Sequence, residues 1–251
     1  MGFFGLFGKK KSAVEKHAER ATNKRAQAPD RWEAIQALGK IATTGEDEDR
    51  PRAVAALLDR FTFYVDPSIT DGEEKEEAFR WICDAGEGVA VPAIRAALRR
   101  HESLSWPLKC LEALVPEARV VEEMLALLEG MDTEYERDPQ RKLQLLGSLE
   151  QKRHPAIAAA VARFFVDVNE TARFHAVGAA FAQENASEVL PQLLAALADE
   201  DSVRVKVRAL EGMAERGLSL GEAKEKIQLP DGWSTDAKGV PRRAPSAGKK
   251  G

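Results

Sequence analysis

Apolar residues recur along the chain at the spacing of helix faces. The clearest stretch runs from Glu188 to Gly217, where apolar residues recur every three or four positions on both sides of a short acidic turn at 199–202. Pro191 stands near the start of the first segment, where a helix needs no amide donor, and Gly217 follows the end of the second. This pattern predicts a helical hairpin.

The second segment of this hairpin contains a motif that the chain repeats. Its apolar or small residues occupy positions i, i+1, i+3 and i+4, which form one face of a helix. The six copies begin at Ala34, Ala78, Cys110, Leu145, Ala176 and Ala209. Consecutive copies start 44, 32, 35, 31 and 33 residues apart. This nearly constant period predicts an array of about six antiparallel helix pairs.

The residues between the copies predict where the partner helices begin. Proline recurs in these intervals at Pro51, Pro92, Pro116, Pro155 and Pro191. Each is expected in the first turn of a helix, where proline is tolerated. The longest interval contains Asp66-Pro67-Ser68 and Asp71-Gly72, which predict a long loop.

The segment Leu190–Met213, LPQLLAALADEDSVRVKVRALEGM, resembles the HEAT-repeat family. Weaker copies run from Val91 to Leu114 and from Pro155 to Phe181, and the resemblance covers roughly residues 30–229. It implies an all-α solenoid of about six HEAT-like antiparallel helix pairs. It also implies a concave surface of the kind that this family uses mainly to bind macromolecules.

Charge divides the chain into three parts. Residues 1–31 carry eight Lys/Arg against three acids, and residues 234–251 carry five against one, while the whole chain has a net charge of -4. The body between them is therefore acidic, at about -13. We expect a basic N-terminal segment at 1–29, the solenoid at 30–229, and a disordered basic tail of Pro, Gly, Ser and Ala at 230–251.

The N-terminal segment starts with an apolar cluster followed by lysines. The residues concerned are Phe3, Phe4, Leu6, Phe7, Lys9, Lys10 and Lys11. A helix would place the four large apolar side chains on one face, with the lysines beside them to meet anionic headgroups. The segment is therefore a candidate contact either for an anionic membrane surface or for a groove on a partner protein.

A second candidate contact is the group Arg95, Arg99 and Arg100, expected on the concave side. One branch of HEAT-like proteins contains alkylpurine DNA glycosylases, which use tryptophans on this side. Here Trp32, Trp81 and Trp106 each have a packing explanation, and Trp233 is the fourth tryptophan of the chain. The acidic body also opposes binding to phosphates, so nucleic acid is not an expected partner.

Motifs for catalysis, metals or cofactors are missing from the sequence. The four histidines are scattered, Gly86-Glu87-Gly88 lacks the context of a phosphate loop, and the two cysteines Cys83 and Cys110 fit a helical core. Neither a signal peptide nor an apolar run long enough to span a bilayer is seen. We therefore expect a cytoplasmic protein, with a peripheral position at the inner face of the cytoplasmic membrane if the N-terminal segment contacts lipid.

These observations favour a noncatalytic HEAT-repeat scaffold or adaptor that acts through protein–protein interactions, without a cofactor or metal. Two alternatives stay open. One is a HEAT-like DNA glycosylase of the alkylpurine type, which would need a basic groove. The other is a HEAT-like lyase or chaperone-type subunit, which would need a chromophore-bearing client protein.

Overall fold

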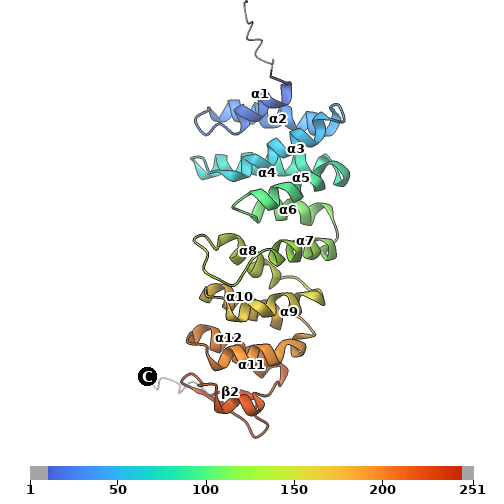
Figure 1. Ribbon diagram of the computed structural model, residues 1–251. Helices are drawn as coiled ribbons and strands as arrows, with labels where there is room; N and C mark the ends of the chain where they lie inside the picture. Colours follow the sequence, from blue (N-terminus) through green and yellow to red (C-terminus); the bar gives the residue numbers. More distant parts are fainter. Residues whose placement is uncertain (1–10, 245–251) are drawn as a thin grey trace, which may run out of the picture. The chain divides into compact units, whose positions relative to one another are not determined.

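The protein is mainly helical in the computed structural model, which describes residues 11–244 (Figure 1). The described residues form twelve α-helices, four short 3-10 helices and two short strands. The chain folds as two compact units, the first ending at Pro116 and the second beginning at Glu117. None of the described helices combines the length and apolar character that crossing a bilayer requires.

The first unit consists of six α-helices and one 3-10 helix. They are α1 (Ala13–Ala21), α2 (Ala28–Thr44), α3 (Asp49–Asp59), η1 (Arg60–Thr62), α4 (Ser68–Asp84), α5 (Glu87–Arg100) and α6 (Ser105–Leu114). Helix α2 packs against α1, α3 and α4, while α5 packs against α3 and α6.

The second unit contains the remaining helices and the strands. They are α7 (Glu117–Glu129), α8 (Gln140–Leu149), α9 (Ala156–Val161), η2 (Ala162–Val166), α10 (Glu170–Phe181), η3 (Ala186–Val189), α11 (Leu190–Ala198), α12 (Val203–Arg216), η4 (Gly221–Glu225), β1 (Trp233–Thr235) and β2 (Pro241–Arg243). Helices α11 and α12 form the hairpin predicted from the sequence. It ends at Gly217, whose φ of 65° is the left-handed conformation typical of a glycine cap.

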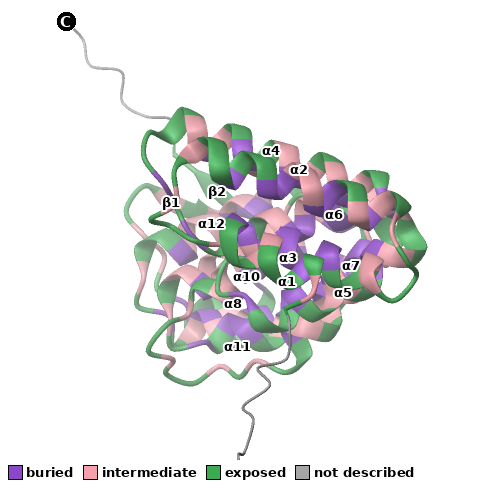
Figure 2. Ribbon diagram, turned by 90° about the horizontal axis from the view of Figure 1, so that it is seen from above, coloured by how far each residue is buried: buried purple, intermediate pink, exposed green. Residues whose placement is uncertain are grey.

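The six copies of the repeated motif lie on α2, α4, α6, α8, α10 and α12, which we call the motif helices. The first residue of every copy is buried. Within the first unit α4 contacts both α2 and α6, and within the second unit α10 contacts both α8 and α12. Buried and exposed residues are interspersed along the helices (Figure 2), as expected of helices that bury one face.

Adjacent motif helices approach closely where one carries a glycine and the other an aromatic side chain. A Cβ atom built on Gly39 of α2 would overlap the indole of Trp81 on α4. In the second unit, a Cβ on Gly212 of α12 would overlap the ring of Phe181 on α10. The glycines therefore provide the space that the aromatic rings fill.

A second periodic feature is a cation three residues before the motif. It is present in five of the six copies, as Arg31, Lys75, Lys142, Arg173 and Lys206. Three of these cations pair with a carboxylate that lies on the next motif helix or just before it. These pairs are Arg31–Glu74 at 2.9 Å, Lys142–Asp167 at 2.7 Å and Arg173–Glu200 at 2.7 Å.

Two local predictions in the first unit are wrong. Asp71 and Gly72, predicted to be in a long loop, lie within α4, which begins at Ser68. The buried Asp71 carboxylate accepts hydrogen bonds from Arg60 Nη2 at 2.8 Å and from the Val65 amide at 3.1 Å, so it fixes the start of α4. Pro92 lies inside α5, because this helix already begins at Glu87.

Both ends of the described chain are more ordered than the composition predicts. Helix α1 begins with a capping box between Ser12 and Glu15, and it packs against α2 and α3.

Strands β1 and β2 form an antiparallel hairpin, and β2 packs against α12. The predicted disorder of the tail is therefore wrong for 233–243, and residues 245–251 lie outside the described residues. The Asp236 carboxylate stabilises the turn between β1 and β2 by accepting hydrogen bonds from the amides of Lys238 and Val240.

Candidate functional site

The N-terminal candidate residues fall mostly outside the described part of the chain. Those outside it are Phe3, Phe4, Leu6, Phe7, Lys9 and Lys10. Lys11 is the first described residue, and its ammonium group pairs with Glu19 of α1. The proposed contact of this segment therefore remains a sequence-based prediction.

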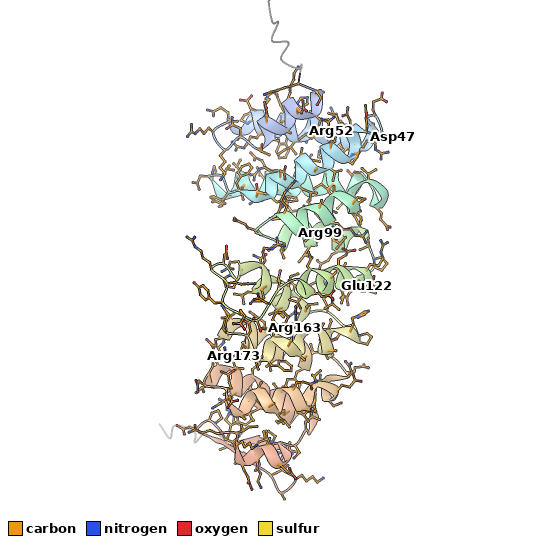
Figure 3. All side chains as sticks on the ribbon, in the orientation of Figure 1. Asp47, Arg52, Arg99, Glu122, Arg163 and Arg173 are labelled. Carbon is orange, nitrogen blue, oxygen red and sulfur yellow. The ribbon has the colours of Figure 1, made fainter. Side chains whose placement is uncertain are left out.

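The three candidate arginines all lie on α5, and they differ in exposure and in pairing. Arg100 Nη2 pairs with Asp59 of α3 at 2.6 Å, whereas Arg99 is exposed (Figure 3) and Arg95 is partly buried. Because Asp59 also accepts a contact from His101 Nε2 at 3.2 Å, this carboxylate offsets the positive charge at the end of α5.

Two tryptophans have the packing roles expected from the sequence. The Trp106 ring stacks on Phe61 with centroids 5.0 Å apart and an interplanar angle of 12°, and the Trp81 indole lies against Gly39. Trp32 differs, because 38% of its surface is exposed. Trp233 is partly exposed in β1.

Cys110 is fully buried, and burial raises the pKa of its thiol well above the ordinary value. Such a thiol stays protonated at neutral pH and packs as a small apolar group. Within residues 11–244, no group of three or more His, Cys, Asp or Glu side chains has the arrangement of a metal site.

The exposed large hydrophobic side chains gather at one kind of place in the fold. Seven are exposed among the described residues, and they are Trp32, Tyr64, Ile69, Tyr135, Val166, Val168 and Val203. Each lies in the segment that leads into a motif helix or in the first five residues of that helix. We call these segments and helix starts the turn edge of each unit. Exposed apolar groups that cluster in this way are typical of interaction surfaces.

The turn edge of the second unit is built from three linked turns, at 131–139, 166–169 and 199–202. The Val168 amide donates to the Thr133 carbonyl at 3.0 Å, which joins the first turn to the second. Ser202 Oγ donates to Glu170 Oε1 at 2.8 Å, which joins the start of α10 to the third turn. The three turns that carry the exposed valines or precede them are therefore linked to one another by hydrogen bonds.

Buried ionic contacts hold these turns in place. Lys142 Nζ lies 2.7 Å from Asp167 Oδ2, and both side chains are almost completely buried. Arg173 donates to both carboxylate oxygens of Glu200 at 2.7 and 2.9 Å, and its Nη1 donates to the Asp167 carbonyl at 2.8 Å (Figure 3 labels Arg173). Burial acts to raise the pKa of Glu200, but the hydrogen bonds from Arg173 and from the Ser202 amide outweigh it and lower the pKa.

A shallow pocket of about 310 Å³ opens on this edge. Val166 and Val168 line one part of it, and Asp199 and Asp201 line another. Arg173 also lines the pocket, but its guanidinium is already occupied by Glu200 and the Asp167 carbonyl. The pocket thus offers apolar surface together with exposed negative charge.

The turn edge of the first unit has a similar character. A pocket of about 380 Å³ opens on this edge. Its lining includes Trp32, Pro29 and Thr70, together with the acids Glu33 and Glu73. Ile69 lies beside Thr70 on α4, and its side chain is well exposed.

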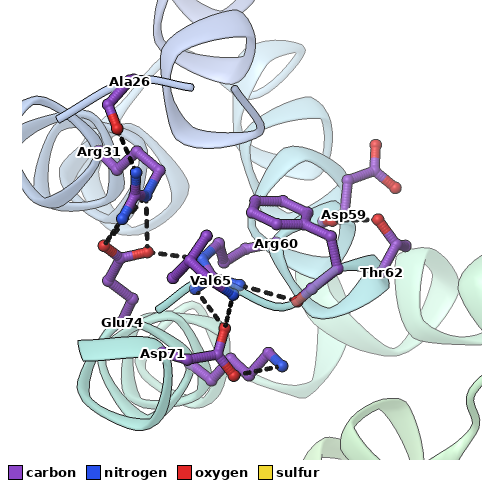
Figure 4. Close-up of polar contacts among 10 residues, drawn as sticks. Ala26, Arg31, Asp59, Arg60, Thr62, Val65, Asp71 and Glu74 are labelled. Atoms are coloured by element: carbon purple, nitrogen blue, oxygen red, sulfur yellow. Dashed lines mark hydrogen bonds and ion pairs between the residues drawn. The ribbon is translucent and has the colours of Figure 1, made fainter. Parts of the chain in front are cut away.

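A buried charge network fixes this edge from below (Figure 4). The Glu74 carboxylate accepts Arg31 Nη2 at 2.9 Å and Arg60 Nε at 2.8 Å, and all three side chains are at least nine-tenths buried. Arg60 also donates to Asp71 at 2.8 Å. Because these groups come from α2, η1 and α4, the network holds the starts of α2 and α4 together.

The turn edges are not evident from the sequence alone. A signal for them is present at 166–168, where Val-Asp-Val places apolar side chains inside a short polar turn. Comparison of the chain with family models, curated proteins and solved structures gave no match. A function is therefore inferred from the residues of this chain alone.

Proposed function

We propose that this protein is a noncatalytic adaptor that binds protein partners through the turn edges of a HEAT-like helical solenoid. Three observations support a solenoid: the six motif copies, the contacts between consecutive motif helices within each unit, and the periodic cations. Repeat proteins of this kind present extended surfaces for partners.

The observation that carries the proposed function is the distribution of the exposed hydrophobic side chains. All seven large ones in residues 11–244 lie on the turn edges. Exposed apolar surface is costly in water, and its burial in an interface contributes about 25 cal/mol per Å². The exposed apolar surface at the turn edges is therefore suited to bind another macromolecule.

Affinity capture from the native cell with a variant of the second turn edge tests this proposal. Val166→Ser, Val168→Ser and Val203→Ser together remove apolar surface without altering charge. The matched control, Ala126→Ser with Ala159→Ser, changes a separate 570 Å³ pocket between α7 and α9. We expect quantitative mass spectrometry to show at least about a tenfold loss of the partner with the valine variant, which corresponds to about 1.4 kcal/mol.

The control variant should capture as much partner as the wild type. Equal capture by the wild type and the valine variant would contradict the proposed role of this edge. Urea denaturation of both variants is needed to show that neither has lost its fold.

We further propose that residues 1–11 attach this adaptor to the anionic inner face of the cytoplasmic membrane. The support is the sequence itself, in which four large apolar residues precede three lysines. Each lysine near such a surface adds about 1 kcal/mol. Sedimentation with anionic vesicles tests it, because Phe4→Glu should reduce pelleting. Pelleting of the variant equal to that of the wild type would refute the attachment.

A further inference from the structure

The turn edge of the second unit is acidic as well as apolar. Its turns and helix starts carry six exposed carboxylates, on Asp132, Glu134, Asp138, Glu170, Asp199 and Asp201. Two exposed cations, Arg137 and Arg204, lie on the same segments. The exposed groups of this edge therefore have a net charge of about -4, and they produce a negative potential beside the exposed valines.

The acids around the pocket are the ones most available to a partner. Asp199 and Asp201 are exposed, and among the described residues neither has an ion-pair partner. The cation nearest to them in the pocket is Arg173, which is held by Glu200 and the Asp167 carbonyl. Because the Arg173 guanidinium is bonded to Glu200 and the Asp167 carbonyl, Asp199 and Asp201 can accept contacts from a partner molecule.

Exposed apolar groups lie close to these acids. Val166 and Val203 are 65% and 61% exposed, respectively. Val203 directly follows the turn that contains Asp199 and Asp201, and Val166 lines the same pocket as the two aspartates. A ligand that covers this edge must therefore present apolar and positively charged groups within a short distance of each other.

We propose that this edge binds a segment of a partner protein in which lysine or arginine side chains alternate with large apolar side chains. The apolar side chains cover the exposed valines, and the cations approach Asp199 and Asp201. An acidic partner is excluded by repulsion, since like charges brought together at an interface oppose binding. This inference rests on the proposed function, because it names the chemistry of the partner.

Peptide binding to the full chain tests the inference. The probe is a short fluorescent peptide in which lysine and leucine alternate. The comparison peptides replace lysine with glutamate or leucine with serine. Fluorescence anisotropy should show that the lysine–leucine peptide binds and that each comparison peptide binds at least about tenfold more weakly, because each lacks one of the two interactions.

Two charge variants test whether peptide binding depends on the acids of this edge or on the overall negative charge of the chain. Asp199→Asn with Asp201→Asn neutralises the edge, and Glu184→Gln with Glu215→Gln removes the same charge from exposed positions elsewhere in the second unit. The first variant should bind the lysine–leucine peptide roughly five- to tenfold more weakly, with a smaller dependence on salt. The second should bind within about twofold of the wild type.

Equal affinities for the two charge variants would overturn the inference, as would equal binding of the glutamate–leucine peptide. Affinity capture with the same variants separates this failure from failure of the proposed function. If the natural partner is lost with the valine variant but retained with the aspartate variant, the edge is an interface. The proposal that it binds a basic segment is then wrong. If every variant retains the partner, the proposed function fails as well.

Discussion

The contact between Gly39 and Trp81 makes the effect of an added methyl group depend on its position. Gly39 and Gly72 both lie inside helices of the first unit, on α2 and α4. Alanine in place of glycine in a helix contributes about 0.5–1 kcal/mol to stability when the methyl group has room. At Gly72 a Cβ atom would meet nothing within 4 Å, so we expect Gly72→Ala to stabilise the unit by about this amount.

At Gly39 the same methyl group would overlap three atoms of the Trp81 indole. The Trp81 ring is partly buried and has the Arg80 guanidinium over its face at 5.0 Å, so it must shift to make room for the methyl group. Overpacking a close contact costs about 1–3 kcal/mol, which exceeds the helix gain. We expect Gly39→Ala to lower the free energy of unfolding by about 1–2 kcal/mol.

Urea denaturation followed by tryptophan fluorescence measures both variants, because the first unit holds most of the fluorophores. The two midpoints should move in opposite directions from that of the wild type, with unchanged slopes. If Gly39→Ala were as stable as Gly72→Ala, the close approach of α2 and α4 at Gly39 and Trp81 would be wrong.

Three further outcomes follow from buried groups. Glu74→Ala should lower the free energy of unfolding by about 3–5 kcal/mol, since two buried guanidiniums lose their shared carboxylate; a loss under about 1 kcal/mol by urea denaturation would contradict this. Burial acts to raise the pKa of Asp71, but hydrogen bonds from Lys75 and Arg60 outweigh it and lower the pKa. Its contribution to stability is therefore present above about pH 4 and is lost as the pH falls through the folded-state pKa. Asp71→Asn should weaken the acid dependence of the thermal midpoint, and an unchanged dependence would refute the assignment. Cys110 should resist a thiol reagent until the chain unfolds, while the half-buried Cys83 reacts first; reaction in the reverse order would contradict the burial.

The sequence was sufficient where structure is set by local signals. The hairpin of α11 and α12 was predicted almost to the residue, because Pro191 marks its start and Gly217 caps its end. Asp71 and Gly72 look like loop residues locally, but the buried Arg60 makes Asp71 part of a helix start. That contact joins residues of two helices, so local turn chemistry could not predict it.

The turn edges were harder to predict because exposure depends on which segments meet in space. The Val-Asp-Val segment at 166–168 marks a turn with apolar side chains, but the sequence does not show whether Val168 faces the core or the solvent; in the structure it is 55% exposed, in a turn whose backbone is hydrogen-bonded to Thr133. The buried ion pairs could be predicted in part, because Lys142 and Arg173 occupy the same position relative to the repeated motif. Their carboxylates, on Asp167 and Glu200, could be recognised only once the turns were placed.

The hairpin of β1 and β2 has a consequence for how this chain can change in length. It packs against α12, with Val240 and Pro241 buried. In the proposed solenoid, a further helical hairpin added after α12 would compete with these strands for the same surface. A repeat added after α12 in a designed array would therefore have to displace this hairpin, whereas one inserted between existing repeats would leave it in place.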